Sequence, residues 1–199
     1  MTNEFIHILD FGCGTGGEII GLAMAFAECR PNIKLLKVKA IDGNQYALNR
    51  FEDIKEEFNR FQMLQIDCNP SAVKIDDFYD LSILETILDN DYDVIMSFKA
   101  VCEFVTKQQF EEKNAYEHIA NFMLPRLSEL GIMLLVDVTS KNEITQEWLP
   151  DLMDKGLKNV NATVIKRNLM NNESFIVNHS RQKGDLSKIA WRLIMQTNN

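Results

Sequence analysis

The sequence has few cysteines, no long apolar run and no excess of positive charge. Its four cysteines, Cys13, Cys29, Cys68 and Cys102, form no C-x-x-C pair. Their scatter argues against a disulfide framework or a zinc site and favours free thiols in a reducing cytoplasm. No apolar stretch approaches the roughly 20 residues that a membrane span needs, and no signal-peptide pattern opens the chain. The net charge of −8 argues against general attraction to nucleic acid or to an anionic membrane.

The composition that is present is that of an ordinary globular protein. Hydrophobic residues make up 46% and charged residues 25% of 199 residues. This length is typical of one domain, at about 100–200 residues each. Neither a repeat nor a linker rich in Pro, Gly or Ser divides it, so we expect one domain over residues 1–199 with a sizeable core.

Short apolar segments alternate with helix-like segments along most of the chain. We expect strands at 5–11, 33–42, 61–66, 92–98 and 132–138, and helices at 17–29, after Asn44, at 78–88, from Thr106 to Gly131 and at 144–155. This alternation predicts an α/β fold, a parallel sheet covered by helices on both faces. Three strand-like segments at 161–169, 174–179 and 189–197 then follow without helices, which predicts an antiparallel edge.

A glycine-rich loop, residues 10–17 (DFGCGTGG), follows the first predicted strand. Its glycines let the backbone turn tightly and approach a ligand, and the next helix offers unpaired N–H groups. Gly12, Gly14 and Gly17 also satisfy the dinucleotide pattern G-x-G-x-x-G. However, Asp10 would repel a pyrophosphate, whereas it could hold an ammonium group. A ligand with an amino acid end therefore fits better than one with phosphates.

Two further acids stand at predicted strand ends. Asp42 could accept hydrogen bonds from both hydroxyls of a ribose, and Asp67 from the exocyclic amine of adenine. With Asp10 they describe an amino acid attached to an adenosine. The plainer alternatives are a helix-capping role for Asp42 and a turn-forming role for Asp67 before Asn69 and Pro70.

At this point the chain resembles the class I S-adenosylmethionine (SAM)-dependent methyltransferases. Residues 8–16 (ILDFGCGTG) are similar to the first motif of that superfamily, and residues 40–44, 66–68 and 92–97 to its second, third and fourth motifs. The resemblance covers about residues 5–140. It implies a three-layer αβα sandwich whose mostly parallel seven-stranded sheet has an antiparallel C-terminal edge. It also implies SAM as cofactor and methyl transfer to a small molecule, a protein or RNA.

The resemblance assigns most of the candidate site residues, and it implies no metal. Asp10, Gly12 and Gly14, with the small Cys13 between the glycines, would surround the methionine part. Asp42 would bind the ribose, Gly43 and Asn44 would shape the adenine edge, Asp67 would meet the adenine amine, and the Cys68 N–H its ring nitrogen. Ser97 and Phe98 would lie near the sulfonium and the methyl group. The catalytic residue stays unassigned: Lys99 or Glu103 could orient or deprotonate an acceptor, or both could belong to a solvated helical turn.

Two departures from the family pattern bear on the acceptor. Residues 97–100 (SFKA) stand where family members that methylate nucleic-acid bases or glutamine amides carry an Asn/Asp-Pro-Pro-aromatic sequence. This difference argues against such groups as the methyl acceptor. Only nine residues precede Asp10, where relatives carry a lid, so we expect a partner chain, a second subunit or a further part of the protein to complete the site. The missing lid leaves open a SAM-binding or degenerate scaffold domain that needs such a partner. The G-x-G-x-x-G match alone leaves open an NAD-dependent dehydrogenase.

Overall fold

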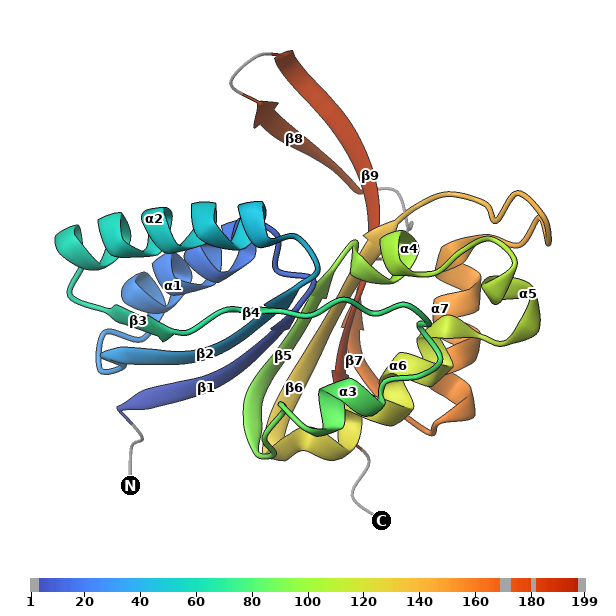
Figure 1. The fold of residues 1–199 in the computed structure, drawn as a ribbon, viewed down its shortest axis with the longest axis horizontal. Helices are drawn as coiled ribbons and strands as arrows, with labels where there is room; N and C mark the ends of the chain where they lie inside the picture. The colour runs from blue at the N-terminus through green and yellow to red at the C-terminus, as the bar shows by residue number, and fades with distance from the viewer. Residues whose placement is uncertain (1–3, 169–172, 180–181, 197–199) are drawn as a thin grey trace.

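The elements follow one another as strand–helix alternations and end in strands. The computed structural model describes residues 4–168, 173–179 and 182–196 (Figure 1). The strands are β1 Phe5–Phe11, β2 Leu35–Asp42, β3 Gln65–Cys68, β4 Ser71–Ala72, β5 Tyr92–Phe98, β6 Leu127–Val138, β7 Thr163–Arg167, β8 Glu173–His179 and β9 Gln182–Met195. The helices are α1 Gly17–Cys29, α2 Gln45–Phe61, α3 Ser82–Glu85, α4 Ala100–Phe104, α5 Gln109–Glu112, α6 Ala115–Met123, the 3₁₀ turn η1 Leu124–Arg126 and α7 Leu149–Asn159.

The main path of the sheet has seven strands in the order β3-β2-β1-β5-β6-β9-β7. The pairs from β3 to β6 are parallel, whereas β9 runs antiparallel between β6 and β7. The mostly parallel sheet with antiparallel C-terminal strands is confirmed, with the reversed strand one place in from the edge. The chain order changes direction at β1, between β2 and β5. In open α/β sheets a ligand binds at the carboxyl ends of the strands at such a point.

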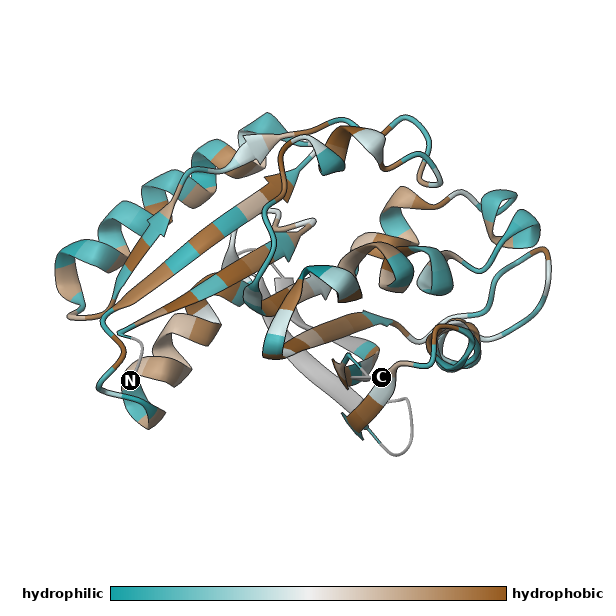
Figure 2. Cartoon of the chain, turned by 90° about the horizontal axis from the view of Figure 1, so that it is seen from below, coloured by the Kyte–Doolittle hydropathy of each residue, from teal (hydrophilic) through white to brown (hydrophobic). Residues whose placement is uncertain are grey.

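Two apolar cores lie on opposite faces of the sheet. Alternate residues of each strand point to opposite faces, so Ile8 belongs to one core and its neighbour Leu9 to the other. Helices α1 and α2 cover the first face around β1–β3, and α3 to α7 cover the second face around β5–β7 (Figure 1). The central strands carry much of the hydrophobic colour, and the long helix α2 alternates between hydrophobic and hydrophilic residues (Figure 2). Because the sheet is packed on both faces, its strands are held in a fixed arrangement, and so are the strand ends.

The predicted helix from Thr106 to Gly131 is wrong in its extent. Its capping box forms as expected, because the Thr106 N–H donates to Gln109 Oε1 and the Gln109 N–H donates to Thr106 Oγ1. The chain then breaks into α5, α6 and η1, and Asn114 caps α6 through its side chain. Gly131 lies inside β6, where an added Cβ would come within 2.6 Å of the Tyr92 carbonyl oxygen. This glycine therefore serves a close, irregular strand pairing with β5 rather than a helix end.

The other helices and strands differ from the expectations mainly in length. The segments 5–11, 17–29 and 92–98 match β1, α1 and β5. The helix expected at 78–88 shortens to α3, and the helix expected at 144–155 begins only at Leu149. Asn142 is the cause in the second case, since its side chain accepts from the Ile144 and Thr145 N–H groups and holds a turn there. The expected strands at 161–169 and 189–197 include residues 169 and 197, which lie outside the described residues.

A hairpin of β8 and β9 extends beyond the sheet. Strand β8 pairs with β9 from Glu173 opposite Ile189 to His179 opposite Gln182. The pairing of β6 with β9 ends at Val138 opposite Ile189. The hairpin therefore projects from the edge at which β6 ends (Figure 1).

Candidate functional site

The glycine loop turns sharply from β1 into α1. Gly12, Gly14 and Gly16 have φ angles of +80°, +50° and +74°, a backbone region that side chains with a Cβ rarely adopt. The Gly12 and Cys13 N–H groups both donate to the Ile41 carbonyl oxygen, at 2.8 and 3.1 Å. These bonds fix the loop against the end of β2.

The three glycines are required for different reasons. A Cβ on Gly12 would lie 2.4 Å from the Ala100 Cβ, and a Cβ on Gly16 would lie 2.0 Å from the Phe51 ring. Both positions are therefore packed against the protein itself. A Cβ on Gly14 would meet no atom within 4 Å, so the space beside Gly14 is open and available to a ligand.

Asp42 connects the loop to the next helix. Its Oδ2 accepts a hydrogen bond from the Gly14 N–H at 2.8 Å, and its Oδ1 accepts from the Asn44 N–H at 2.7 Å. Asn44 is the residue that caps α2, since its side chain accepts from the Tyr46 and Ala47 N–H groups. The two oxygens of a carboxylate have about four acceptor positions. Asp42 therefore keeps capacity for ligand hydroxyl groups.

Asp10 is fully buried, and neither of its carboxylate oxygens has a hydrogen-bond partner. Burial raises the pKa of this carboxyl well above its ordinary value, and the nearby acids Glu18 and Asp42 raise it further. A buried carboxyl without a partner is costly for a folded protein. Such a group is a strong candidate for contact with a ligand.

Glu18 is a neighbour that the sequence did not single out. It is the second residue of α1, and burial raises its pKa to about 7, with a further contribution from Asp42. An acid in the first turn of a helix is common because its negative charge interacts favourably with the helix dipole. The sequence therefore carried no signal that distinguished this glutamate from an ordinary one.

The carboxyl end of β5 adds further candidate residues to those of the glycine loop and β2. Asp10 lies opposite Met96 in the β1–β5 register, so Ser97 and Phe98 lie level with the start of the glycine loop. Ser97 is buried and its Oγ has no hydrogen-bond partner, whereas Phe98 is half-buried. Lys99 follows at a φ of +57° and donates its N–H to the Val136 carbonyl oxygen at 2.8 Å. The structure thus brings the candidates from three strand ends to one edge of the sheet.

Asp67 lies apart from this group, whereas the Cys68 side chain is buried in the same apolar core as Cys13. In the β2–β3 register Asp67 is opposite Lys37 and Cys68 is opposite Val38, several residues before the end of β2 at Asp42. Asp67 is exposed and lines a shallow cavity with His7 and Lys37. Cys68 is buried, and burial raises its thiol pKa to about 12. The residue that reaches the Asp42 level is Val73, whose N–H donates to the Asp42 carbonyl oxygen.

A buried polar network lies behind the end of β6. Asp137 Oδ2 accepts from the Tyr116 hydroxyl at 2.9 Å and from the Cys102 N–H at 3.1 Å, and its Oδ1 accepts from the Val138 N–H. Burial raises the pKa of Asp137, while these donors lower it. Every member is engaged, and Asp137 and Tyr116 are fully buried. The network therefore supports the start of α4 rather than forming a ligand site.

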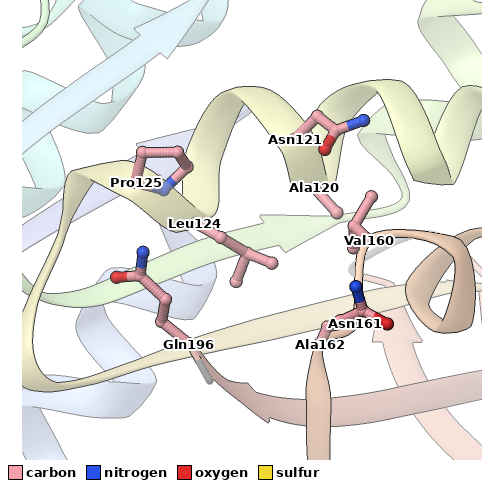
Figure 3. A pocket seen from close by; sticks show the side chains of 8 residues that line it. All are labelled: Ala120, Asn121, Leu124, Pro125, Val160, Asn161, Ala162 and Gln196. Carbon is pink, nitrogen blue, oxygen red and sulfur yellow. The ribbon is translucent and has the colours of Figure 1, made fainter. Parts of the chain in front are cut away.

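A separate cavity of about 200 Å³ lies at the opposite edge of the sheet, where β6 and β7 begin (Figure 3). It is lined by Ala120, Asn121, Leu124, Pro125, Val160, Asn161, Ala162 and Gln196. Since ligands of parallel α/β sheets bind at the carboxyl edge, this cavity is not the candidate site.

Across the described residues, no helix is both long and apolar enough to cross a membrane.

The strand order and the glycine loop define an α/β fold of the nucleotide-binding type with one reversed strand. No protein-family model matches the chain, and no curated protein matches its sequence. Solved structures do match. A SAM-dependent methyltransferase from Methanosarcina mazei is 13% identical with a TM-score of 0.57, and the match covers 98% of this chain and 95% of that one. The glycopeptide N-methyltransferase MtfA in complex with SAM is 10% identical with a TM-score of 0.60, over 97% of this chain and 82% of that one. The chain therefore has the fold of the class I SAM-dependent methyltransferases.

Proposed function

We propose that this protein binds SAM and transfers its methyl group to an acceptor. Two observations on the glycine loop carry the proposal: the Asp10 carboxyl at its start is buried without a hydrogen-bond donor, and the space at Gly14 is open. A carboxylate in that place suits an ammonium group and disfavours a phosphate. This distinguishes the loop from the dinucleotide loops that share its glycine pattern.

The residues present fit the parts of SAM in order. Asp10 and the backbone of Gly12–Gly14 would hold the methionine part, and Asp42 the ribose hydroxyls. Gly43, Asn44 and the nearby Val73 carbonyl oxygen would border the adenine; this carbonyl lies 3.6 Å from the position of a Cβ on Gly43. We propose Val73 for the adenine edge in place of Asp67, because the strand register puts Asp67 at the level of Lys37.

Bound SAM supplies an electrophilic methyl group on a cationic sulfonium. The task of the chain is to hold donor and acceptor in line, since positioning provides much of the rate gain in a bimolecular transfer. Ser97 and Phe98 stand where the donor and an acceptor would meet. Lys99, held by its N–H bond to Val136, is the residue that we propose to orient an anionic or polar acceptor.

Titration calorimetry tests this proposal directly. SAM should bind measurably but weakly, with a Kd of about 10 μM or poorer, about −7 kcal/mol or less favourable, and NAD should not bind. Formation of S-adenosylhomocysteine with amine, carboxylate or RNA acceptors then identifies the acceptor class. Binding of SAM without product from any class would support the scaffold alternative, and binding of NAD in preference to SAM would overturn the proposal.

A further inference from the structure

The first face of the sheet is covered by helices at one end only. Helices α1 and α2 pack on it around β1–β3, and the apolar core beneath them reaches no further than Ile132 of β6. The other helices that the structure describes, α3 to α7, all contribute to the core on the second face (Figure 1). Within the described residues, no helix therefore covers the first face where β6 and β9 form it.

This uncovered part of the sheet is built from apolar side chains. Alternate residues of a strand share a face, and those on the side of Ile132 form three antiparallel pairs: Ile132 with Met195, Leu134 with Leu193 and Val136 with Trp191. We call these six residues the open face. Val136 is buried and the other five are partly exposed. Leu134, Leu193 and Met195 belong to neither of the two apolar cores, so a further apolar surface is needed to bury them.

The chain as a whole exposes more surface than a compact monomer of its mass. Its accessible surface is 11622 Å² at 22.9 kDa. A folded monomer of this mass is expected to expose about 9,600 Å². The excess of roughly 2,000 Å² is larger than the roughly 800 Å² that each partner buries in a standard interface. The projecting hairpin accounts for part of this excess, and the open face is an apolar surface on which a dimer would bury more of it.

We propose that the open face is the interface of a homodimer, in which the open faces of two copies pack against each other. Two sheets pack well face to face, at a spacing of about 10 Å. A two-fold axis brings the same patch of both copies together, and this is the commonest arrangement of soluble oligomers. Lys166 of β7, opposite Leu193, bounds the open face, so this charge lies at the rim, where interfaces carry their charged residues.

The open face reaches the edge of the sheet at which the candidate site lies. Phe98, at the end of β5, is opposite Val136, which in turn is opposite Trp191. The second copy would therefore stand beside Phe98 and add surface next to the site. The interface itself does not depend on the proposed function, because it follows from the strand register and the exposed apolar side chains.

The molar mass of the full chain in solution tests the proposal. At about 50 μM, the wild type should sediment as a dimer of twice 22.9 kDa. Leu134→Lys should sediment as a monomer with an unchanged circular dichroism spectrum, because a buried ammonium group without a partner disfavours the interface. Met63→Lys is the matched control at an 83% exposed apolar residue between α2 and β3, and it should remain a dimer. Leu193→Thr, which keeps a strand-forming residue, should weaken the dimer tenfold or more.

Tryptophan fluorescence gives a second measurement that leaves the open face unchanged. The chain has two tryptophans, so Trp148→Phe leaves Trp191 as the single reporter. Dilution from about 50 μM to about 0.5 μM should shift its emission to longer wavelength as the dimer dissociates and water reaches the ring.

A wild-type chain that is monomeric at about 50 μM would overturn the proposal and leave the open face to a different partner. A dimer that persists in folded Leu134→Lys, or that dissociates without a shift of the Trp191 emission, would place the interface elsewhere on the molecule and equally overturn it.

Discussion

At the scale of single residues, the candidate site is organised by carboxyl groups that serve different purposes. Asp42 is bonded within the protein, to the Gly14 and Asn44 N–H groups. Asp10 has no partner although it is fully buried. The first residue therefore shapes the loop, and the second is held ready for a ligand at a cost to the folded state.

Asp42 offers the most direct test of the proposed ribose contact. Asp42→Ala should weaken SAM binding by about 1–3 kcal/mol, because a charged acceptor of two hydroxyls and an anchor of Gly14 are both lost. Asp53→Ala, an exposed aspartate on α2, is the control with the same charge change. Calorimetry on both variants measures the difference, and equal affinities would remove Asp42 from the site.

The Asp10–Glu18 pair should also set the pH dependence of stability in the absence of ligand. Glu18 has an ordinary pKa of 4.5, raised to about 7 in the folded chain. Between these values the folded state binds more protons, so the stabilising contribution is complete below about pH 4.5 and is lost as the pH rises through 7. The contribution to the free energy of unfolding should fall by roughly 1–3 kcal/mol from pH 5 to 7.5.

Urea unfolding of the wild type and of Glu18→Gln at both pH values checks this expectation. The variant should gain stability relative to the wild type at pH 7.5 and lose that advantage at pH 5. A constant difference between the two proteins across the range would mean that Glu18 titrates as an exposed glutamate does.

At the scale of elements, the glycine loop separates a binding position from two packing positions. Gly14 borders open space, whereas Gly12 and Gly16 face Ala100 and Phe51 at distances too short for a side chain. The sequence motif treats these glycines alike, but their surroundings differ. Substitution should therefore affect ligand binding at one position and folding at the other two.

Gly14→Ala and Gly16→Ala form the matching pair of variants. Gly14→Ala should cost about 1–2 kcal/mol of stability from its positive φ and weaken SAM binding by tenfold or more, because the methyl group occupies ligand space. Gly16→Ala should cost more stability, since the same backbone strain is joined by a clash with the Phe51 ring. Thermal unfolding and calorimetry measure both effects, and a Gly14→Ala variant with unchanged affinity would contradict the placement of the ligand.

At the scale of the whole molecule, the reversed strand β9 is held by an ion pair between the buried Arg192 and the partly exposed Asp154. Arg192 is fully buried and donates from Nε and Nη2 to the two oxygens of Asp154 on α7, at 2.6 and 2.9 Å. Its Nη1 donates to the Trp191 carbonyl oxygen and to Asn168 Oδ1. These bonds connect β9 directly to α7, although β7 and β8 separate the two elements along the chain.

Asp154→Asn should therefore lower the free energy of unfolding by about 2–4 kcal/mol, because it leaves a buried guanidinium without its counter-charge. Asp151→Asn, an exposed residue in the first turn of the same helix, should change it by a few tenths of a kcal/mol. Chemical denaturation compares the two. Similar losses in both variants would show that the pair contributes little to the docking of β9.

The sequence by itself determined the alternation of elements and the position of the glycine loop. The strands at 5–11 and 92–98 and the helix at 17–29 were predicted with their observed bounds, because apolar runs and glycine breaks are local signals. The assignment of Asp10 and Asp42 to one strand edge followed in the same way, since consecutive parallel strands end on the same side of a sheet.

Only the tertiary structure decided which polar groups meet. Strand register is a matter of pairing between distant segments, and it moved Asp67 away from Asp42 and brought Val73 beside it. In the folded chain Glu18 acts on Asp10 and raises its pKa, although an acid in the first turn of a helix does not stand out in the sequence. The close approach of β6 to β5 turned Gly131 from an apparent helix end into a strand residue. In each case the deciding contact joins residues that are far apart in the chain or differ only in burial, and no local pattern encodes either property.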